Sequence, residues 1–268
     1  MNAPAVALTI AGSDSSAGAG LQADLKAFSA LGVYGLTVAT AIVAERPGAV
    51  LSSELVSPGA ISDQLRAVLT HYPIRAIKTG LLPSSAAVEA VAAALQGFPV
   101  RVVIDPVAVA STGTALASAG AGAALADFIR TCGRLVTPNR AEAEHFLGMA
   151  IPGPEEARDA ARGLQQLFGC AVLLKGGHFE GPDAIDWLAH DPRGDVEKIR
   201  APRIPGLDLH GTGCTYSAAI AAHLALGKEL PTAVREARRY LHSAMQGHFH
   251  WPGRGDEGIK ALANPAES

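Results

Sequence analysis

The sequence predicts an α/β fold with a central, mostly parallel sheet whose two faces are both covered by helices. Short apolar runs rich in β-branched residues alternate along the chain with longer Ala- and Leu-rich stretches of helical period, which is the pattern of βαβ units. The strand-like runs are apolar almost throughout, as expected of strands buried on both faces. Of the 268 residues, 49% are hydrophobic and 18% are charged, so the chain can bury a sizeable core.

Strands and helices are expected to alternate strictly over the first two thirds of the chain. The helix expected at 18–31, for example, has apolar residues at positions 21, 25, 28 and 31, which share one helical face. We expect strands at residues 6–10, 36–43, 74–78, 100–104, 134–137 and 170–175. We expect the intervening helices at residues 18–31, 61–69, 86–95, 119–129 and 155–168.

The strict alternation of strands and helices ends in the last third of the chain. The expected elements there are strands 184–190 and 196–203 and helices 214–226 and 232–246. Residues 191–194 have the Asp-Pro-Arg-Gly composition of a hairpin turn between the two strands. The polar tail 252–268 contains Gly and Pro and is expected to fray. Because no linker or internal repeat separates these elements, we expect a single domain over residues 1–268.

Composition argues against nucleic-acid and membrane partners. The net charge is −3, the 22 basic residues form no run longer than a pair, and aromatic residues make up only 5%. No apolar stretch approaches the roughly 20 residues of a membrane helix, and nothing resembles a signal peptide, so we expect a cytoplasmic protein. The cysteines Cys132, Cys170 and Cys214 lack C-x-x-C spacing, which argues against a disulfide framework or a zinc site.

Polar residues follow each of the six strands expected in the first two thirds of the chain. In an open parallel sheet, ligands bind beyond the carboxyl ends of the strands, so these residues are expected to line one crevice. In chain order the clusters are Gly12-Ser13-Asp14, Glu45, Lys78-Thr79-Gly80, Asp105-Pro106, Thr137-Pro138-Asn139 with Glu142, and Lys175-Gly176-Gly177.

The common nucleotide and metal motifs are not matched. Gly18-Ala19-Gly20 resembles the start of a dinucleotide-binding G-x-G-x-x-G fingerprint, but Ala23 stands where its third glycine belongs. A P-loop sequence and an H-E-x-x-H sequence are both lacking. A cofactor-dependent oxidoreductase is therefore the weakest alternative that we consider.

The segment His210-Gly211-Thr212-Gly213-Cys214 carries the strongest chemical signal, because it directly precedes an Ala-rich helix. Glycines let successive backbone N–H groups point one way, and the start of the helix adds free donors and a positive dipole end. Such a loop is expected to form an anion hole for transferring phosphate oxygens. We expect the same dipole to lower the pKa of Cys214, whose thiolate would accept a proton from an attacking hydroxyl. The structural alternative is a Gly-rich helix entry with a buried cysteine.

Four residues at other strand ends fit phosphoryl transfer. Carboxylate and amide oxygens suit the Mg²⁺ that neutralises nucleotide oxygens, and Asp105, Asn139 and Glu142 supply them. Asn139 and Glu142 are three residues apart at an expected helix start and so share a face; alternatively they are a helix cap and a solvated charge. Lys175 ends a strand before two glycines and is expected to reach phosphate.

In order along the chain, these motifs resemble those of the ribokinase superfamily, specifically its hydroxymethylpyrimidine/phosphomethylpyrimidine kinase branch. The matching segments are residues 9–14, 18–26, 103–107, 137–139 with Glu142, 175–178 and 210–214, which together span nearly the whole chain. Cys214 is the most specific feature. Most of the superfamily has aspartate at this position, whereas this branch and the related pyridoxal kinases have cysteine.

The resemblance implies a three-layer αβα ribokinase-like fold, ATP and Mg²⁺ as cofactors, and a homodimer. It implies a kinase that phosphorylates the hydroxymethyl group of 4-amino-5-hydroxymethyl-2-methylpyrimidine, and then its monophosphate, in thiamine biosynthesis. A pyridoxal kinase of the cysteine type is the alternative within the superfamily. A catalytically silent ligand-binding protein of the same fold is the alternative from another class.

The resemblance also implies roles for individual residues. Cys214 would be the base, and the backbone of Gly211, Thr212 and Gly213 would stabilise the developing charge. Four residues would lie near the nucleotide: Thr137, Asn139, Lys175 and His210. Two carboxylates would lie near Mg²⁺, directly or through water: Asp105 and Glu142. Four residues would form the substrate pocket: Asp24 and Glu45 by their side chains, and Gly12 and Val107 by their backbone.

Departures from the branch concern the substrate. Glu45 stands where the branch has a glutamine that pairs with the aminopyrimidine edge, and an ionised glutamate only accepts hydrogen bonds. The branch's Met and Lys are Ala108 and Ser111 here, and residues 78–83 look more like the pyridoxal kinases. Residues 44–51 and 111–118 are candidate lids over the site.

Overall fold

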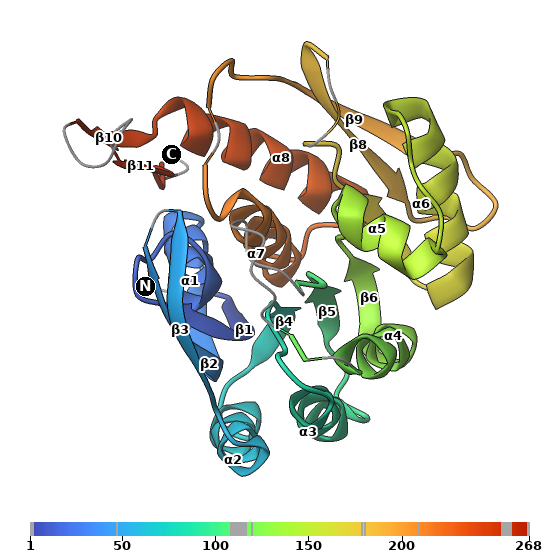
Figure 1. Cartoon of the computed structure of the whole chain (residues 1–268). Coiled ribbons are helices and arrows are strands. Elements are labelled where there is room, and N and C mark those ends of the chain that lie inside the picture. Colours follow the sequence, from blue (N-terminus) through green and yellow to red (C-terminus); the bar gives the residue numbers. More distant parts are fainter. Residues whose placement is uncertain are drawn as a thin grey trace.

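The computed structural model describes residues 3–46, 48–107, 117–118, 120–177, 179, 181–207, 209–252 and 259–266. Its centre is a nine-stranded sheet with the order β3-β2-β1-β4-β5-β6-β7-β8-β9 (Figure 1). The strands are β1 (Val6–Asp14), β2 (Tyr34–Arg46), β3 (Ala49–Leu55), β4 (Ile74–Thr79), β5 (Arg101–Ile104), β6 (Gly133–Val136), β7 (Ala171–Leu174), β8 (Asp183–Ala189) and β9 (Glu197–Pro202). The strands from β2 to β7 in this order pair in parallel, whereas β3 at one edge and β8 and β9 at the other pair antiparallel.

Helices cover both faces of this sheet (Figure 1). One face carries α1 (Gly20–Ala30), α7 (Thr212–Ala225) and α8 (Leu230–Gln246). The other carries α2 (Pro58–Leu69), α3 (Ser85–Leu95), α4 (Ala121–Cys132), α5 (Arg140–Leu147) and α6 (Pro154–Phe168). The expected three-layer α/β architecture with a mostly parallel sheet is therefore confirmed. No helix in the described ranges has the length and apolar run that a bilayer span requires.

The strand sequence explains why two separate cores form. Along β1, Val6, Leu8 and Ile10 point into the core beneath α2 to α6, whereas Ala7 points to the α1, α7 and α8 side. Alternate residues of a strand face opposite sides of a sheet, so an apolar run buries both faces at once. Each large side chain buried in this way contributes roughly 1.5–3 kcal/mol. The prediction of a sheet covered on both faces holds for this central part.

Helix ends follow local sequence signals. Ser57 and Ser84 cap α2 and α3, each accepting a hydrogen bond from the backbone N–H three residues later, at 3.2 Å. Gly148 and Gly169 end α5 and α6 in the left-handed conformation, with φ of 65° and 70°. The expected elements accordingly appear with ends shifted by a few residues.

Three strands were not expected from the sequence. They are β3 and the antiparallel pair β10 (Phe249–Trp251) and β11 (Ile259–Ala261). Of α5, only the start at Asn139 was expected. β3 is an edge strand whose residues 51–55 are all exposed, so its sequence lacks the apolar pattern of a buried strand. Of the candidate lid 44–51, residues 44–46 and 49–51 belong to the paired strands β2 and β3, and residue 47 lies outside the described residues. In the tail, β11 is paired where we expected fraying; the second candidate lid lies, except for residues 117 and 118, outside the described residues.

The strand order alone predicts where a ligand-binding crevice lies in the sheet. β1 pairs with β2 on one side and with β4 on the other, so the chain changes direction across the sheet at β1. Ligands of open α/β sheets bind beyond the carboxyl ends of the strands at such a switch point. Residues 12–14 at the end of β1, residues 78–80 at the end of β4 and the amino end of α7 all meet there.

Candidate active site

The amino end of α7 is built by close backbone contact with the loop before α1. Gly211 is the N-cap of α7 and has a left-handed backbone, with φ of 82°. A Cβ at this position would lie 1.8 Å from the carbonyl oxygen of Gly18, so only glycine fits. Because Gly211 offers no side-chain cap, the first N–H groups of the helix are left for a ligand. This geometry agrees with the anion hole predicted for residues 211–213.

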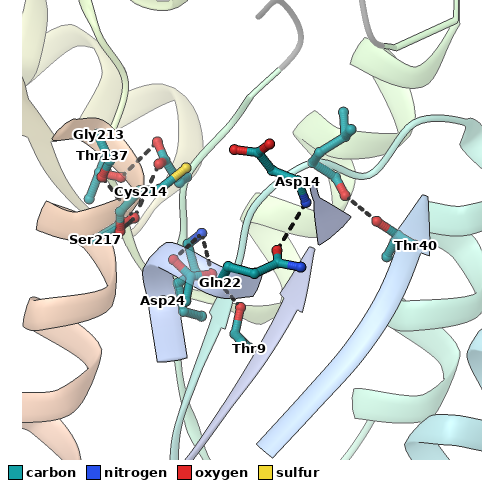
Figure 2. Close-up of polar contacts among 12 residues, drawn as sticks. Thr9, Asp14, Gln22, Asp24, Thr40, Thr137, Gly213, Cys214 and Ser217 are labelled. Atoms are coloured by element: carbon teal, nitrogen blue, oxygen red, sulfur yellow. Dashed lines mark hydrogen bonds and ion pairs between the residues drawn. The ribbon is translucent and has the colours of Figure 1, made fainter. Parts of the chain in front are cut away.

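Cys214 lies between the amino ends of two helices. It is the third residue of α7, and its sulfur interacts with the backbone N–H of Gly20, the first residue of α1. Gly20 also has a left-handed backbone, and a Cβ there would lie 2.3 Å from the carbonyl oxygen of Gly12. Figure 2 shows the sulfur of Cys214 beside the polar groups of the crevice.

The predicted lowering of the Cys214 pKa is wrong. Burial raises the pKa of the thiol to about 11, although the Lys78 ammonium and the Gly20 N–H act in the opposite direction. The two helix ends therefore do not outweigh the loss of water around the sulfur. In the ligand-free protein, Cys214 is a protonated thiol at neutral pH.

A buried ion pair lies next to Cys214. Nζ of Lys78, near the end of β4, is 3.0 and 2.8 Å from the two carboxylate oxygens of Asp24, and both side chains have 0% exposure. Thr9 donates a 2.5 Å hydrogen bond to the same carboxylate (Figure 2). Burial alone would lower the pKa of Lys78, but the Asp24 carboxylate raises it, so the ammonium stays charged. We expected Asp24 to line the substrate pocket; its carboxylate is instead sealed in this ion pair.

Asp105 joins four segments at the carboxyl edge of the sheet. It follows β5 and accepts hydrogen bonds from Lys175 after β7 at 2.8 Å and from Thr137 after β6 at 3.3 Å. Ser217 of α7 donates to its other oxygen at 3.1 Å (Figure 2). Burial would raise the pKa of Asp105, but the ammonium groups of Lys175 and Lys78 lower it. The structure thus brings together the strand ends that the sequence assigned to phosphate chemistry.

Asn139 and Glu142 form a reciprocal cap at the start of α5. Oδ1 of Asn139 accepts from the Glu142 N–H at 3.0 Å, and Oε2 of Glu142 accepts from the Asn139 N–H at 2.8 Å. The cap that we considered as an alternative is therefore present, but Glu142 is not a solvated charge. Burial raises its pKa to about 7; the Lys175 ammonium opposes the shift and the Asp105 carboxylate adds to it. The carboxylates of Asp105 and Glu142 both interact with the Lys175 ammonium, and carboxylate oxygens are ligands that suit Mg²⁺.

The raised pKa of Glu142 predicts a pH-dependent gain from Glu142→Gln. The protonated form of Glu142 favours the folded state, so its stabilisation is complete below its ordinary pKa of 4.5 and is lost as the pH rises through about 7. Glutamine mimics the protonated acid and still accepts the capping hydrogen bond. We expect the variant to raise the free energy of unfolding by about 1–3 kcal/mol near pH 9 and by little near pH 5. Urea unfolding at several pH values measures this difference.

Glu144 on the same helix provides the matched control. Hydrogen bonds from the Ile151 N–H and from Arg140 hold its pKa below the ordinary value. Glu144→Gln should therefore lose stability near neutral pH rather than gain it. Equal effects of Glu142→Gln near pH 5 and pH 9 would contradict the assigned shift.

A second cluster groups Glu45, His210 and Asp14. Nε2 of His210 is 3.4 Å from Oε1 of Glu45 and 3.5 Å from Oδ2 of Asp14, and one such atom from each residue lies within 4.8 Å of the others. Asp14 also accepts hydrogen bonds from Ser16 and from the N–H groups of Gly18 and Ala19. Burial would raise its pKa, but these bonds and His210 lower it to about 2. Its oxygens are thus already used in holding the loop before α1, which disfavours a metal ion here.

Residues 14–259 match the family described as phosphomethylpyrimidine kinase. The chain belongs to this family. It is 46% identical over 243 residues to the hydroxymethylpyrimidine/phosphomethylpyrimidine kinase of Rhizobium meliloti (strain 1021), and the match covers 90% of both chains. A crystal structure of phosphomethylpyrimidine kinase from Clostridium difficile 630 is 35% identical, has a TM-score of 0.78, and covers 90% of this chain and 99% of that chain. An ADP complex of Bacillus subtilis pyridoxal kinase is 32% identical, has a TM-score of 0.88, and covers 98% of both.

Membership of the phosphomethylpyrimidine kinase family confirms the ribokinase-like fold and the kinase activity expected from the sequence. Within the described residues, Cys214, Asp105, Lys175 and Thr137 meet as expected. His210 does not lie with them, because its imidazole faces Glu45, on the side expected to hold the substrate. Gly12 approaches Gly20 through its carbonyl group, and the Val107 N–H is bonded to the carbonyl of Asp105.

Ser217 of this kinase site was missed, whereas Lys78 and Asp14 were expected to line the crevice but were given no individual role. Lys78 had a visible signal, since a lysine inside an otherwise apolar strand must find a buried partner or unfold the strand. Asp14 is the last residue of β1, which is where an anchor for the following loop is needed. Ser217 had no signal, because a serine one turn into an Ala-rich helix is ordinary.

Proposed function

We propose that this chain is an ATP-dependent kinase that phosphorylates the hydroxymethyl group of 4-amino-5-hydroxymethyl-2-methylpyrimidine and then converts the monophosphate to the diphosphate. The observation that carries the proposal is the junction of Cys214 and its glycine loop with the Asp105–Lys175 pair at the carboxyl edge of the sheet. A Cβ on Gly213 would lie 3.3 Å from Nζ of Lys175, so the anion hole and this ammonium adjoin. A 42% identical relative, the thiamine biosynthesis bifunctional protein of Geobacter sulfurreducens, supports a role of this site in thiamine biosynthesis.

Each group at this site has its own role in phosphoryl transfer. The N–H groups at the start of α7 bind the oxygens of the transferring group, and Lys175 supplies a positive charge beside them. Cys214 accepts the proton of the attacking hydroxyl. Because burial raises the pKa of this thiol to about 11, the thiol must first release its own proton to solvent, and the resulting thiolate then accepts the proton of the hydroxyl. In the second reaction the acceptor is a phosphate that is largely ionised at neutral pH, so that step needs the base less.

We propose that the reaction also requires Mg²⁺. Asp105 and Glu142 would hold it, directly or through water, and it would neutralise the oxygens of the nucleotide. The pKa of about 7 for Glu142 supports this placement, since a buried carboxylate whose charge is costly is stabilised by an added cation.

A pyridoxal-type substrate is the second candidate. It is favoured by Glu45 and by the pyridoxal kinase of Bacillus subtilis, which superposes on more of the chain than does the Clostridium difficile structure. A coupled assay of ADP formation with hydroxymethylpyrimidine, its monophosphate and pyridoxal, run side by side, separates the two. We expect the highest kcat/KM with the pyrimidine. Phosphorylation of pyridoxal alone would overturn the proposal.

Glu45→Gln tests how the ring is recognised. We expect this variant to keep or improve kcat/KM for hydroxymethylpyrimidine, because glutamine both donates and accepts, whereas ionised Glu45 only accepts. Burial raises the pKa of Glu45, and the nearby His210 acts in the opposite direction. Steady-state kinetics with each ring measures the change. Lost pyrimidine activity beside unchanged pyridoxal activity would contradict this placement of Glu45.

A further inference from the structure

The backbone that carries Lys175 is fixed by two charged residues outside the site described above. Lys175 itself donates its N–H to the carbonyl of Pro138 at 2.9 Å, which ties β7 to the segment before α5. The next residue, Gly176, donates its N–H to Oδ1 of Asp186 at 2.8 Å. Asp186 is a buried residue of β8, 1% exposed, and its other oxygen lies 3.4 Å from Nε of Arg238 on α8. A Cβ on Gly176 would lie 1.7 Å from the carbonyl oxygen of Ile185, so the backbone at Gly176 packs directly against the backbone of β8.

Arg203 holds the same segment from the other side. It directly follows β9, and its guanidinium donates to the carbonyl oxygens of Gly177 at 2.7 Å, Gly181 at 3.0 Å and Gly176 at 3.4 Å. It also donates to the carbonyl of Phe179. A planar guanidinium with five N–H groups is the side chain suited to such a set of acceptors, and lysine cannot reproduce it. Both the N–H and the C=O of Gly176 are therefore held by charged side chains.

We propose that Arg203, acting with Asp186, is a positioning residue for the nucleotide, because it fixes the backbone that aims Lys175 at the anion hole. The proposal rests on the proposed function, in which Lys175 contacts nucleotide phosphate. The Lys175 side chain is 13% exposed and its Nζ donates a hydrogen bond to Asp105, so small rotations of the backbone displace Nζ from both Asp105 and the start of α7. Arg203 acts on the nucleotide only through this backbone, and the pyrimidine side around Glu45 does not depend on it.

The test compares nucleotide and pyrimidine affinity in Arg203→Ala and Arg203→Lys. We expect the Kd for ATP, measured by calorimetry without pyrimidine, and the KM for ATP to rise about tenfold in both variants, because lysine keeps the charge but not the four hydrogen bonds. The KM for hydroxymethylpyrimidine should stay within about twofold. Arg200→Ala is the matched control, since Arg200 lies on β9, is 67% exposed and pairs with Asp183 at 2.5 Å. That variant should bind ATP like the wild type.

Two results with the Arg203 variants would contradict the role of Arg203. A folded Arg203→Ala protein with wild-type affinity for ATP overturns it, as does an equal rise of both KM values, which a general loss of structure would produce. If the alanine variant does not fold, the lysine variant gives the answer, because it retains the cation. A wild-type protein that fails to bind ATP would instead overturn the proposed function, so the two failures are distinguishable.

Discussion

Replacing Cys214 with alanine is expected to lower kcat for hydroxymethylpyrimidine about 100-fold or more, while the KM for ATP changes little. A positioned general base contributes roughly 10²–10⁴-fold, and no other cysteine lies in the described site. The loss should be smaller with the monophosphate as acceptor, because an ionised phosphate needs no base. Steady-state kinetics with both acceptors gives the two ratios.

The pH dependence makes this test specific. Since burial raises the pKa of Cys214 to about 11, little thiolate is present at neutral pH, and wild-type kcat/KM should increase between about pH 7 and pH 9. This increase should be absent from Cys214→Ala. Cys170→Ala is the control: burial also raises the pKa of that thiol to about 11, but Cys170 lies at the amino end of β7, opposite the carboxyl end of the sheet where the site lies. Near-normal turnover of Cys214→Ala would refute the assignment of the base.

Breaking the Asp24–Lys78 pair is expected to cause the largest loss of stability. Asp24→Asn leaves a fully buried ammonium without a counter-charge, which costs about 3–5 kcal/mol of the free energy of unfolding. Lys78→Met should be costly for the same reason on the carboxylate side. The double variant should lose less than the sum of the two single losses, because no unpaired charge remains. Urea unfolding of the three variants measures this coupling.

An exposed pair gives the reference for that experiment. Arg66 and Asp63 lie 2.6 Å apart on α2, with their side chains 76% and 68% exposed. Asp63→Asn should change stability by less than about 1 kcal/mol, because water already solvates both charges. A comparably small effect of Asp24→Asn would show that Lys78 gives up its proton rather than remaining a buried cation.

The sequence predicted the sheet and the meeting of distant strand ends, because both follow from hydrophobic period and chain direction. Parallel strands present their carboxyl ends at one edge, so residues after β5, β6 and β7 had to come close whatever their side chains. β3 was missed because an exposed edge strand has no apolar pattern. Only the start of α5 was expected, because its eight residues bury only Ala143 and so show no apolar face.

The directions in which side chains point, and how deeply they are buried, could not be predicted from the sequence. Asp24 is near the amino end of α1, and only the fold shows that it turns inward to Lys78 and not outward to a ligand. His210 adjoins the anion loop in sequence, yet its ring faces Glu45 across the crevice. The pKa of Cys214 was mispredicted because the helix dipole is visible in the sequence, whereas the desolvation that outweighs it depends on packing.

The close backbone contacts of Gly211 with Gly18 and of Gly20 with Gly12 have a consequence for how the enzyme is made. The two sides of the anion loop are separated by nearly 200 positions, and they touch without intervening side chains. On the ribosome the amino-terminal strands emerge long before α7, which buries its face against α1, β1 and β4. The nascent chain therefore carries an uncovered apolar sheet face and no phosphate site until its last quarter has been synthesised. The chain becomes able to catalyse the reaction only when α7 and α8 pack on this face and complete the core that they form with α1.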